Sequence, residues 1–294
     1  MTPVELVRLP GLMRLGGGRP EVAVALIDGP VVLGLPDFAG STIREIPGRL
    51  KGTCTRANTI ACTHGTFVAG ILFARRGSVA PAICPGCTML LRPIFAETTQ
   101  GNGQMPGATP EELAEALVEC VNAGARVINL SSAVVRPSRK GDSKLEEALE
   151  HAASRGAITV AATGNQGVIG SSAITRHPWV IPVTACDVNG VPLTGSNLGN
   201  SIGRRGLSAP GSGILSLGTD GKPKRFDGTS AAAPFVTGAI ALLWSEFSSA
   251  EAASIKMAVL QASGARRRSI APPVLDAWGA YQVMASAQRR RPAA

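Results

Sequence analysis

The chain has 294 residues, of which 45% are hydrophobic and 17% charged, so it is long enough for one large globular domain with a full core. Its 35 glycines and 21 prolines are dispersed among apolar runs, which predicts many tight turns rather than low complexity. The formal net charge is +9, but the arginine runs at 266–268 and 289–291 have no aromatic residues between them. Solvated surface charge is therefore expected, and nucleic-acid binding is not.

Neither a targeting segment nor a membrane span is expected. Residues 1–30 lack the uninterrupted apolar core of a secretory signal, and no propeptide-sized segment precedes Asp28. These features favour a cytoplasmic protein over a secreted one. The longest apolar stretch, Ala231 to Trp244, is interrupted by Thr237 and is shorter than the ~20 residues of a membrane-spanning helix. It predicts a buried helix instead.

Six cysteines are too sparse in this chain for a disulfide scaffold, so free thiols are expected. Cys54 and Cys62 lie in one loop, and Cys84 and Cys87 enclose Pro-Gly, a spacing that leaves a four-thiolate zinc site conceivable. An ordinary turn is the favoured interpretation of Cys-Pro-Gly-Cys, and no metal or cofactor is expected. The other two cysteines are expected in the core: Cys120 and Cys186.

Apolar runs alternate with helical patterns along the chain. The segment Thr109-Pro110-Glu111-Glu112 has the hydroxyl, proline and glutamate of a capped helix start. The alternation predicts parallel strands joined by right-handed crossovers. The predicted strands are 21–27, 89–94, 126–131, 157–163 and 179–186, and the predicted helices are 65–74, 109–124, 143–155 and 231–244.

No interior linker or repeat divides the chain. We expect one globular domain at 21–285, preceded by an N-terminal segment, 1–20, and followed by a basic tail, 286–294. A long polar loop is expected at 39–63. The turn residues at 187–190 and 220–222 each predict a hairpin.

Three residues stand in contexts that suit acyl transfer, which needs a nucleophile, a base to take its proton, and an acid to orient the base. Asp28 ends an apolar strand, His64 precedes the small-residue helix, and Ser230 begins the buried helix. Each has a plainer reading, as a turn aspartate, a loop histidine and an N-cap serine. The other histidines, His151 and His177, read as structural or solvent-exposed.

Five blocks in register resemble the successive motifs of the subtilase family across most of the chain: residues 24–29 (VALIDG), 64–70 (HGTFVAG), 127–131 (VINLS), 161–165 (AATGN) and 228–234 (GTSAAAP). The resemblance implies an α/β fold with a subtilisin-like doubly wound parallel sheet flanked by helices. It also implies a serine endopeptidase with Ser230 as nucleophile, His64 as general base and then acid, and Asp28 as its orienter. Asn165 would donate its amide to the oxyanion.

In such a protease one strand pairs with the substrate backbone. The substrate-binding residues that the resemblance implies are Asn129, Leu130, Ser131, Ser132, Ala133 and Gly164.

Shorter blocks resemble the subtilisin-like proteases that mature ribosomal peptides of the cyanobactin kind: residues 9–12 (LPGL), 28–31 (DGPV), 84–87 (CPGC), 92–95 (RPIF) and 208–211 (SAPG). The implied partner is a peptide substrate, in particular a ribosomally made precursor peptide with a leader.

Some positions depart from the family pattern. Phe67 stands where many subtilases have a second histidine, Ala231 where a methionine is usual, and residues 132–134 where a leucine and glycines line the groove. Side chains at Ala133 and Val134 predict a narrower groove and selective cleavage. A general housekeeping subtilase, an inactive peptide-binding pseudoprotease and, on net charge alone, a nucleic-acid-binding protein remain as alternatives.

Overall fold

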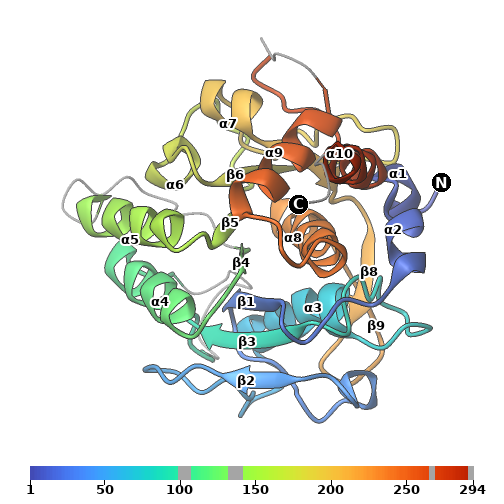
Figure 1. Cartoon of the computed structure of the whole chain (residues 1–294). Coiled ribbons are helices and arrows are strands. Elements are labelled where there is room, and N and C mark those ends of the chain that lie inside the picture. The colour runs from blue at the N-terminus through green and yellow to red at the C-terminus, as the bar shows by residue number, and fades with distance from the viewer. Residues whose placement is uncertain (99–106, 132–141, 265–268, 291–294) are drawn as a thin grey trace.

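A parallel sheet of seven strands forms the centre of the computed structural model, which describes residues 1–98, 107–131, 142–264 and 269–290 (Figure 1). The strand order is β2-β3-β1-β4-β5-β6-β7, and each neighbouring pair is parallel. The strands are β1 (Ala23–Asp28), β2 (Ile43–Glu45), β3 (Thr88–Pro93), β4 (Val127–Leu130), β5 (Ile158–Ala162), β6 (Ile181–Cys186) and β7 (Leu207–Pro210).

Helices cover both faces of this sheet (Figure 1). One face carries α3 (Ile60–Phe73) and α8 (Thr229–Glu246), and the other carries α4 (Pro110–Asn122) and α5 (Asp142–Ser154). The predicted doubly wound α/β fold is confirmed. The remaining elements are α1 (Pro3–Leu6), α2 (Leu9–Leu15), η1 (Pro36–Phe38), α6 (Ala173–Arg176), α7 (Asn200–Arg205), β8 (Ile214–Leu217), β9 (Pro223–Phe226), α9 (Ala252–Ala262) and α10 (Ala277–Arg289).

Strand β1 shows why its sequence is apolar throughout. Val24 and Leu26 belong to the core under α3 and α8, whereas Ala25 and Ile27 belong to the core under α4 and α5. Because both faces of a central parallel strand are buried, successive side chains must all be apolar. Asp28 breaks this run at the carboxyl end of the strand, the edge where sites gather in such sheets.

Several predicted elements agree with the structure. At the start of α4, Thr109 Oγ1 accepts a hydrogen bond from Glu112 N, and Thr109 N donates to Glu112 Oε2, so the capping box is present. Gly156, after α5, has a φ of +70°, which glycine adopts without strain. Residues 220–222 form the turn of the β8–β9 hairpin.

The start of α3 was predicted wrongly. The expected loop extended to residue 63, but the helix begins at Ile60, so His64 lies within it rather than before it. The Thr59 side chain accepts a hydrogen bond from Cys62 N and caps the helix. Two short strands of the sheet were also not predicted, β2 and β7.

Helix α2, near the start of the chain, lies beside α10, near its end (Figure 1). Arg8 pairs with Asp276 at 2.6 Å, and Ala277 N donates to Val7 O. Leu9 of α2 is completely buried against the main core. Helix α10 extends to Arg289, inside the range expected to be a tail. Among the helices within the described ranges, none is long and apolar enough to cross a membrane.

Candidate active site

A buried acid and a histidine meet where β1 ends and α3 passes over it. Asp28 Oδ1 lies 2.7 Å from His64 Nδ1 and also accepts from Gly29 N at 2.6 Å. Asp28 is completely buried, and 11% of the His64 side chain is exposed. Asp28 Oδ2 has no hydrogen-bond partner among the residues that the structure describes. The carboxylate is thus directed at the Nδ1 edge of one imidazole ring.

This approach of β1 to α3 needs two glycines. A Cβ on Gly65 would lie 2.4 Å from Gly29 O, and a Cβ on Gly29 would lie 2.0 Å from Ala61 O. Both distances are impossible for real side chains, so the helix backbone reaches the strand end only because Gly29 follows Asp28 and Gly65 follows His64. The close packing of α3 on the end of β1 therefore explains why glycine follows both Asp28 and His64.

Asp28 controls the protonation of His64. Burial disfavours the charged imidazolium, but the negative charge of Asp28 and the hydrogen bond to it outweigh burial and raise the pKa of His64. In the neutral ring, the proton lies on Nδ1, where the carboxylate accepts it, and Nε2 keeps its lone pair. An imidazole held in this tautomer can take a proton through Nε2.

Ser230 is the second residue of α8 and is half-buried. Its N–H belongs to the first turn, where the helix itself provides no acceptor, at the positive end of the helix dipole. Among the hydrogen bonds between described residues, none joins Ser230 Oγ to His64. Such bonds are often long in free enzymes and shorten in the substrate complex. The two residues belong to helices that pack against each other, α3 and α8.

Asn165 follows β5 and is exposed. Its Oδ1 accepts hydrogen bonds from Thr229 N at 2.9 Å and Thr229 Oγ1 at 3.0 Å. Because both donors hold the carbonyl oxygen, the amide NH₂ is the group left to bind elsewhere. Thr229 adjoins Ser230, so this amide is attached to the start of α8. Gly228 leaves room for it, since a Cβ there would lie 2.9 Å from Asn165 Nδ2.

Thr229 is a functional candidate that the sequence did not single out. Its hydroxyl also accepts a hydrogen bond from Gly164 N at 3.1 Å, so one side chain connects the end of β5 with the start of α8. Gly164 has a φ of +101°, and its carbonyl accepts from Asn197 N. The only available sequence signal was the position of Thr229 directly before the serine.

The first two residues of the expected substrate strand lie inside the central sheet. Asn129 and Leu130 belong to β4, whose backbone pairs with β1 on one side and β5 on the other. They therefore have no free edge for an added strand. The Asn129 side chain is completely buried, donates to Ser131 Oγ at 2.6 Å and accepts from Thr237 Oγ1 at 2.8 Å.

Ser131 directly follows β4 and is also buried. Ser132 and Ala133 lie outside the described residues. Of the described part of the expected substrate strand, only Ser131 lies beyond the paired backbone of β4.

The other two histidines have structural partners. His151 lies in α5, on the opposite face of the sheet from α3, and its Nε2 is 3.2 Å from Asn122 Oδ1. His177 follows α6 and is buried, with Nε2 3.1 Å from Glu150 Oε1. Neither joins the Asp28–His64 pair.

The expectation of free thiols is wrong for two cysteines. Cys54 and Cys62 form a disulfide, with a Cα–Cα distance of 5.8 Å that suits such a bond. The polar loop folds back on the first turn of α3, which spacing alone could not predict. Because both sulfurs are bonded, a four-thiolate zinc site is excluded. The other four cysteines are free and buried: Cys84, Cys87, Cys120 and Cys186.

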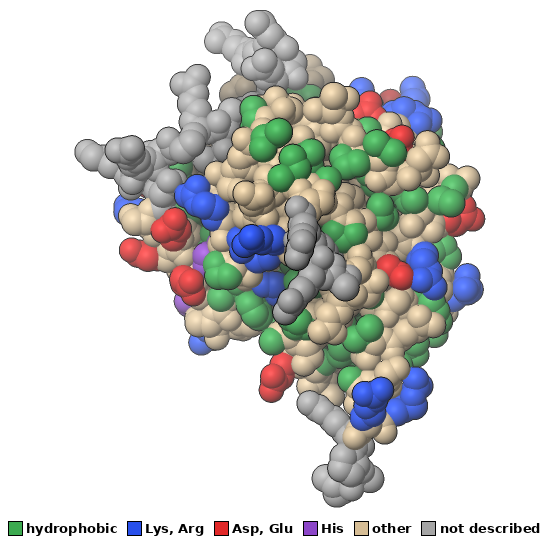
Figure 2. Space-filling view, turned by 90° about the horizontal axis from the view of Figure 1, so that it is seen from above, with side chains coloured by type: hydrophobic (Ala, Val, Ile, Leu, Met, Phe, Trp, Pro, Cys, Tyr) green, Lys and Arg blue, Asp and Glu red, His purple; other side chains and the backbone are tan. Residues whose placement is uncertain are grey.

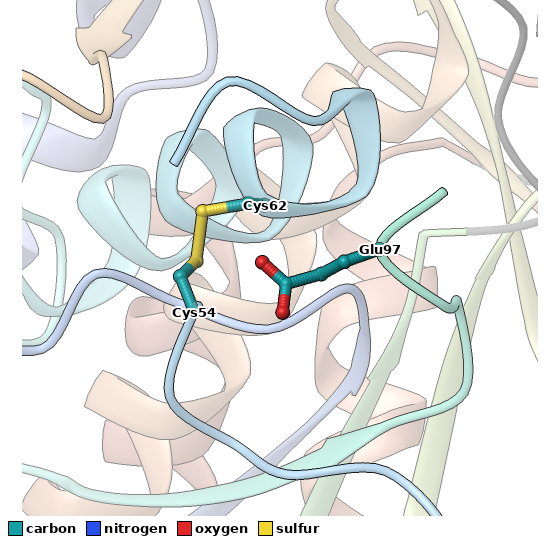
Figure 3. A group of neighbouring side chains, drawn as sticks. All are labelled: Cys54, Cys62 and Glu97. Atoms are coloured by element: carbon teal, nitrogen blue, oxygen red, sulfur yellow. A yellow bond between two sulfur atoms is a disulfide. The ribbon is translucent and has the colours of Figure 1, made fainter. Parts of the chain in front are cut away.

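Glu97 lies beside this disulfide (Figure 3). Its carboxylate accepts hydrogen bonds from Thr55 N, Thr55 Oγ1 and Arg56 N, at 2.9, 2.6 and 2.7 Å. Burial works against the charged form, but these hydrogen bonds prevail and lower the pKa of Glu97. A disulfide does not offer the thiolates that a metal ion prefers. Through its hydrogen bonds, Glu97 instead holds the loop at Thr55 and Arg56.

Comparisons with a protein-family model and with curated proteins point to the same family. The subtilase family model matches residues 19–279. The thermostable alkaline protease of Halalkalibacterium halodurans is 30% identical over 187 residues, which are 63% of this chain and 48% of that protein. Subtilisin amylosacchariticus of Bacillus subtilis subsp. amylosacchariticus is 27% identical over 250 residues, 83% of this chain and 60% of that protein. The chain thus spans about half to three fifths of these curated relatives.

Two solved structures are similar over nearly the whole chain. A serine-to-alanine mutant of the protease domain of PatA superimposes with a TM-score of 0.83 at 31% identity, covering 92% of this chain and 97% of that one. The prenylagaramide maturation protease PagA superimposes with a TM-score of 0.80 at 29% identity, covering 94% and 98%.

Proposed function

The chain belongs to the subtilase family, and on this basis we propose that it is a serine endopeptidase with Asp28, His64 and Ser230 as its catalytic triad. One observation carries the proposal: a completely buried carboxylate lies 2.7 Å from the imidazole of a histidine on the helix that packs against the helix of Ser230. This arrangement provides an oriented base on one helix, and the helix packed against it begins with Ser230 as its second residue.

The reaction follows from these groups. Ser230 Oγ attacks the peptide carbonyl as His64 Nε2 takes its proton, and the imidazolium then protonates the leaving amine. Asp28 stays ionised and stabilises the imidazolium. The developing oxyanion receives hydrogen bonds from the Asn165 amide and the Ser230 N–H. Water, activated by the same imidazole, then hydrolyses the acyl-enzyme.

The substrate that we propose is a ribosomally made precursor peptide. The support is the similarity to the protease domain of PatA and to PagA, which is described as a maturation protease for prenylagaramide. The peptide would lie extended beside Ser131 and the two residues after it, with Gly164 on the other side. No cofactor enters this mechanism.

Nucleic acid is not part of the proposal. On the face drawn in Figure 2, basic side chains occur in several small groups among acidic and hydrophobic ones. The net charge of +9 therefore supports attraction of a flexible acidic peptide better than a continuous phosphate-binding surface.

The cellular location remains a prediction. The sequence favoured the cytoplasm, but the Cys54–Cys62 disulfide favours an oxidising compartment, since cytosolic thiols are kept reduced. We propose that the enzyme works where this disulfide persists.

Covalent labelling tests the activity directly. A fluorophosphonate probe should label the wild-type protein and leave Ser230→Ala unlabelled, and the substitution should abolish peptide hydrolysis, as in subtilisin, where losing the nucleophile costs on the order of 10⁶ in kcat. Wild-type hydrolysis by purified Ser230→Ala would refute the serine protease. Folded wild-type protein that resists the probe and cleaves no peptide would instead indicate a peptide-binding pseudoprotease.

Mass spectrometry tests the substrate. Incubation with a candidate precursor peptide should give a single pair of products. Cleavage of many unrelated peptides would favour the alternative, a general housekeeping subtilase.

A further inference from the structure

An aromatic ring lies against the His64 imidazole on the side of the β8–β9 hairpin. The ring centroids of His64 and Phe226 are 6.1 Å apart, with the planes tilted by 51°. Phe226 in turn meets Phe67 edge to face, with centroids 4.8 Å apart at 86°. His64 and Phe67 are three residues apart in α3 and so lie on one face of the helix. Both contact Phe226 from that face.

The hairpin holds Phe226 in place. Phe226 pairs with Ile214 of β8, which is completely buried. Ser216 of the same strand donates its hydroxyl to Phe67 O at 2.8 Å, which attaches the hairpin to α3. Just after Phe226, Gly228 N donates to Gly211 O at 2.7 Å, at the entrance to α8. The ring is therefore part of a packed frame, although Phe226 is only half-buried.

One hydrogen bond holds the imidazole among the residues that the structure describes. This bond joins Nδ1 to Asp28, and a single hydrogen bond at Nδ1 still allows the ring to rock about it. Aromatic neighbours restrict such rocking, because edge-to-face and tilted arrangements have preferred geometry. They also exclude water from the face that they cover.

We propose that Phe226 is a positioning residue for His64: together with Phe67, it keeps the imidazole in the plane set by Asp28 and shields one side of the ring from water. The inference rests on the proposed function for its kinetic part only. It also accounts for Phe67, which stands where many subtilases have a second histidine: here a phenylalanine supports the Phe226 ring.

Charged groups near His64 also influence its pKa, so they must be located before a pKa shift is assigned to the Phe226 ring. Asp28 of β1 contacts the ring directly, and Lys224 Nζ of β9 lies 5.9 Å from the Phe226 centroid. Most of the other charged groups on the described elements that pack against α3 or the hairpin have partners: Asp37 with Arg75, Arg225 with Gly213 O, Asp227 with Gly213 N, and Lys222 with Asp220. The remaining one, Glu246, lies at the far end of α8.

Removing the ring should have two effects. Burial holds the pKa of His64 down, so exposing the imidazole in Phe226→Ala should move its pKa upward. A base that rocks out of line should lower kcat on the order of ten- to a hundredfold with little change in KM, because displacement of a catalytic group by about 1 Å can cost a hundredfold. Phe226→Tyr keeps the ring and should restore both values.

The experiment combines NMR titration with kinetics. The imidazole C–H signals are followed against pH in a Ser230→Ala background, with the His64 signal assigned from variants of the other two histidines. The kinetics use the chain with its serine. Leu215→Ala is the matched control, since Leu215 is an exposed hydrophobic residue of the same hairpin and neighbours Ile214 on the opposite face. Leu215→Ala should change neither the pKa of His64 nor kcat.

Several results would overturn the proposal. Phe226→Ala could leave both the titration and kcat unchanged, or could raise KM alone, which would make Phe226 a substrate contact. Equal losses in Leu215→Ala would indicate general disruption of the hairpin. An equal pKa shift in Lys224→Ala would assign the effect to the charge.

Two safeguards keep the outcome interpretable. If Phe226→Ala does not fold, Phe226→Leu, which keeps bulk but lacks the ring, should give the same shifts to a smaller extent, and wild-type values there would refute the positioning role. The titration needs no catalysis. A chain inactive towards peptides and probe would refute the proposed function, while the titration would still decide the role of Phe226.

Discussion

Nδ1 of His64 lies 2.7 Å from Oδ1 of Asp28, and the carboxylate is completely buried. A buried charge persists only with a compensating partner. Gly29 N supplies one hydrogen bond and His64 the other. The pair therefore sets both the tautomer of the imidazole and the pH at which it becomes a base.

The first prediction concerns pH. Because His64 must be neutral to accept a proton, kcat/KM should fall as pH drops through a pKa above the usual histidine value. In Asp28→Asn, burial acts unopposed, so this acid limb should move to lower pH, and kcat should fall by about 10⁴, as for the equivalent change in the convergent chymotrypsin-type triad. Steady-state kinetics across pH check both effects. An acid limb that stays in place would show that Asp28 does not control the titration of His64.

The same pair contributes to stability in a defined pH window. Since the folded state raises the pKa of His64, its contribution is fully present below the unfolded pKa and is lost as pH rises through the folded value. Denaturant unfolding at several pH values should show this loss in Ser230→Ala. It should be absent when Asp28 is also replaced by asparagine, and an unchanged profile in that double variant would contradict the assignment.

The second active-site prediction concerns Asn165. Its amide would meet a charge that exists only in the transition state, so Asn165→Ala should lower kcat by ~10²–10³ with little change in KM. Thr229→Val should produce a smaller loss, because the Thr229 N–H would still hold Asn165 Oδ1. Michaelis–Menten kinetics separate the two constants. A defect mainly in KM would make Asn165 a substrate-positioning residue.

Local patterns predicted the fold well where the cause is local. The capping box at Thr109 and the apolar run before Asp28 depend on neighbours in sequence, and both appear as expected. The start of α3 is set by the Thr59 cap, whereas the prediction relied on the small apolar residues farther along the helix. The helix start was therefore missed.

Features that depend on tertiary arrangement were beyond local patterns. That β4 lies between β1 and β5, which closes the backbone of Asn129 to a substrate, follows from sheet order. The partner of Cys54 and the approach of Phe226 to His64 follow from the paths of a loop and a hairpin. Sequence motifs identified candidate residues for the site, but not the groups that support them.

The disulfide gives the next prediction. Cys62 is two residues before His64 in α3, so the bond to Cys54 anchors the helix start that carries the proposed base. Breaking a cross-link over a separation of 8 residues should cost about 2–3 kcal/mol of unfolding free energy. Thermal unfolding with and without reductant checks this. A variant with serine at both positions should already be destabilised and should not respond to reductant, and an equal response there would place the effect elsewhere.

The last prediction concerns substrate choice. The net charge of +9 should attract an acidic leader over long range, and the side chains at Ala133 and Val134 favour selective cleavage over digestion. Because the Debye length shrinks from about 10 Å at 0.1 M salt to 3 Å at 1 M, added salt should lower kcat/KM for a peptide with an acidic leader. The same peptide without its leader should respond much less, which makes it the matched control, and casein should remain largely intact. Rapid degradation of casein at many sites, insensitive to ionic strength, would identify a general protease.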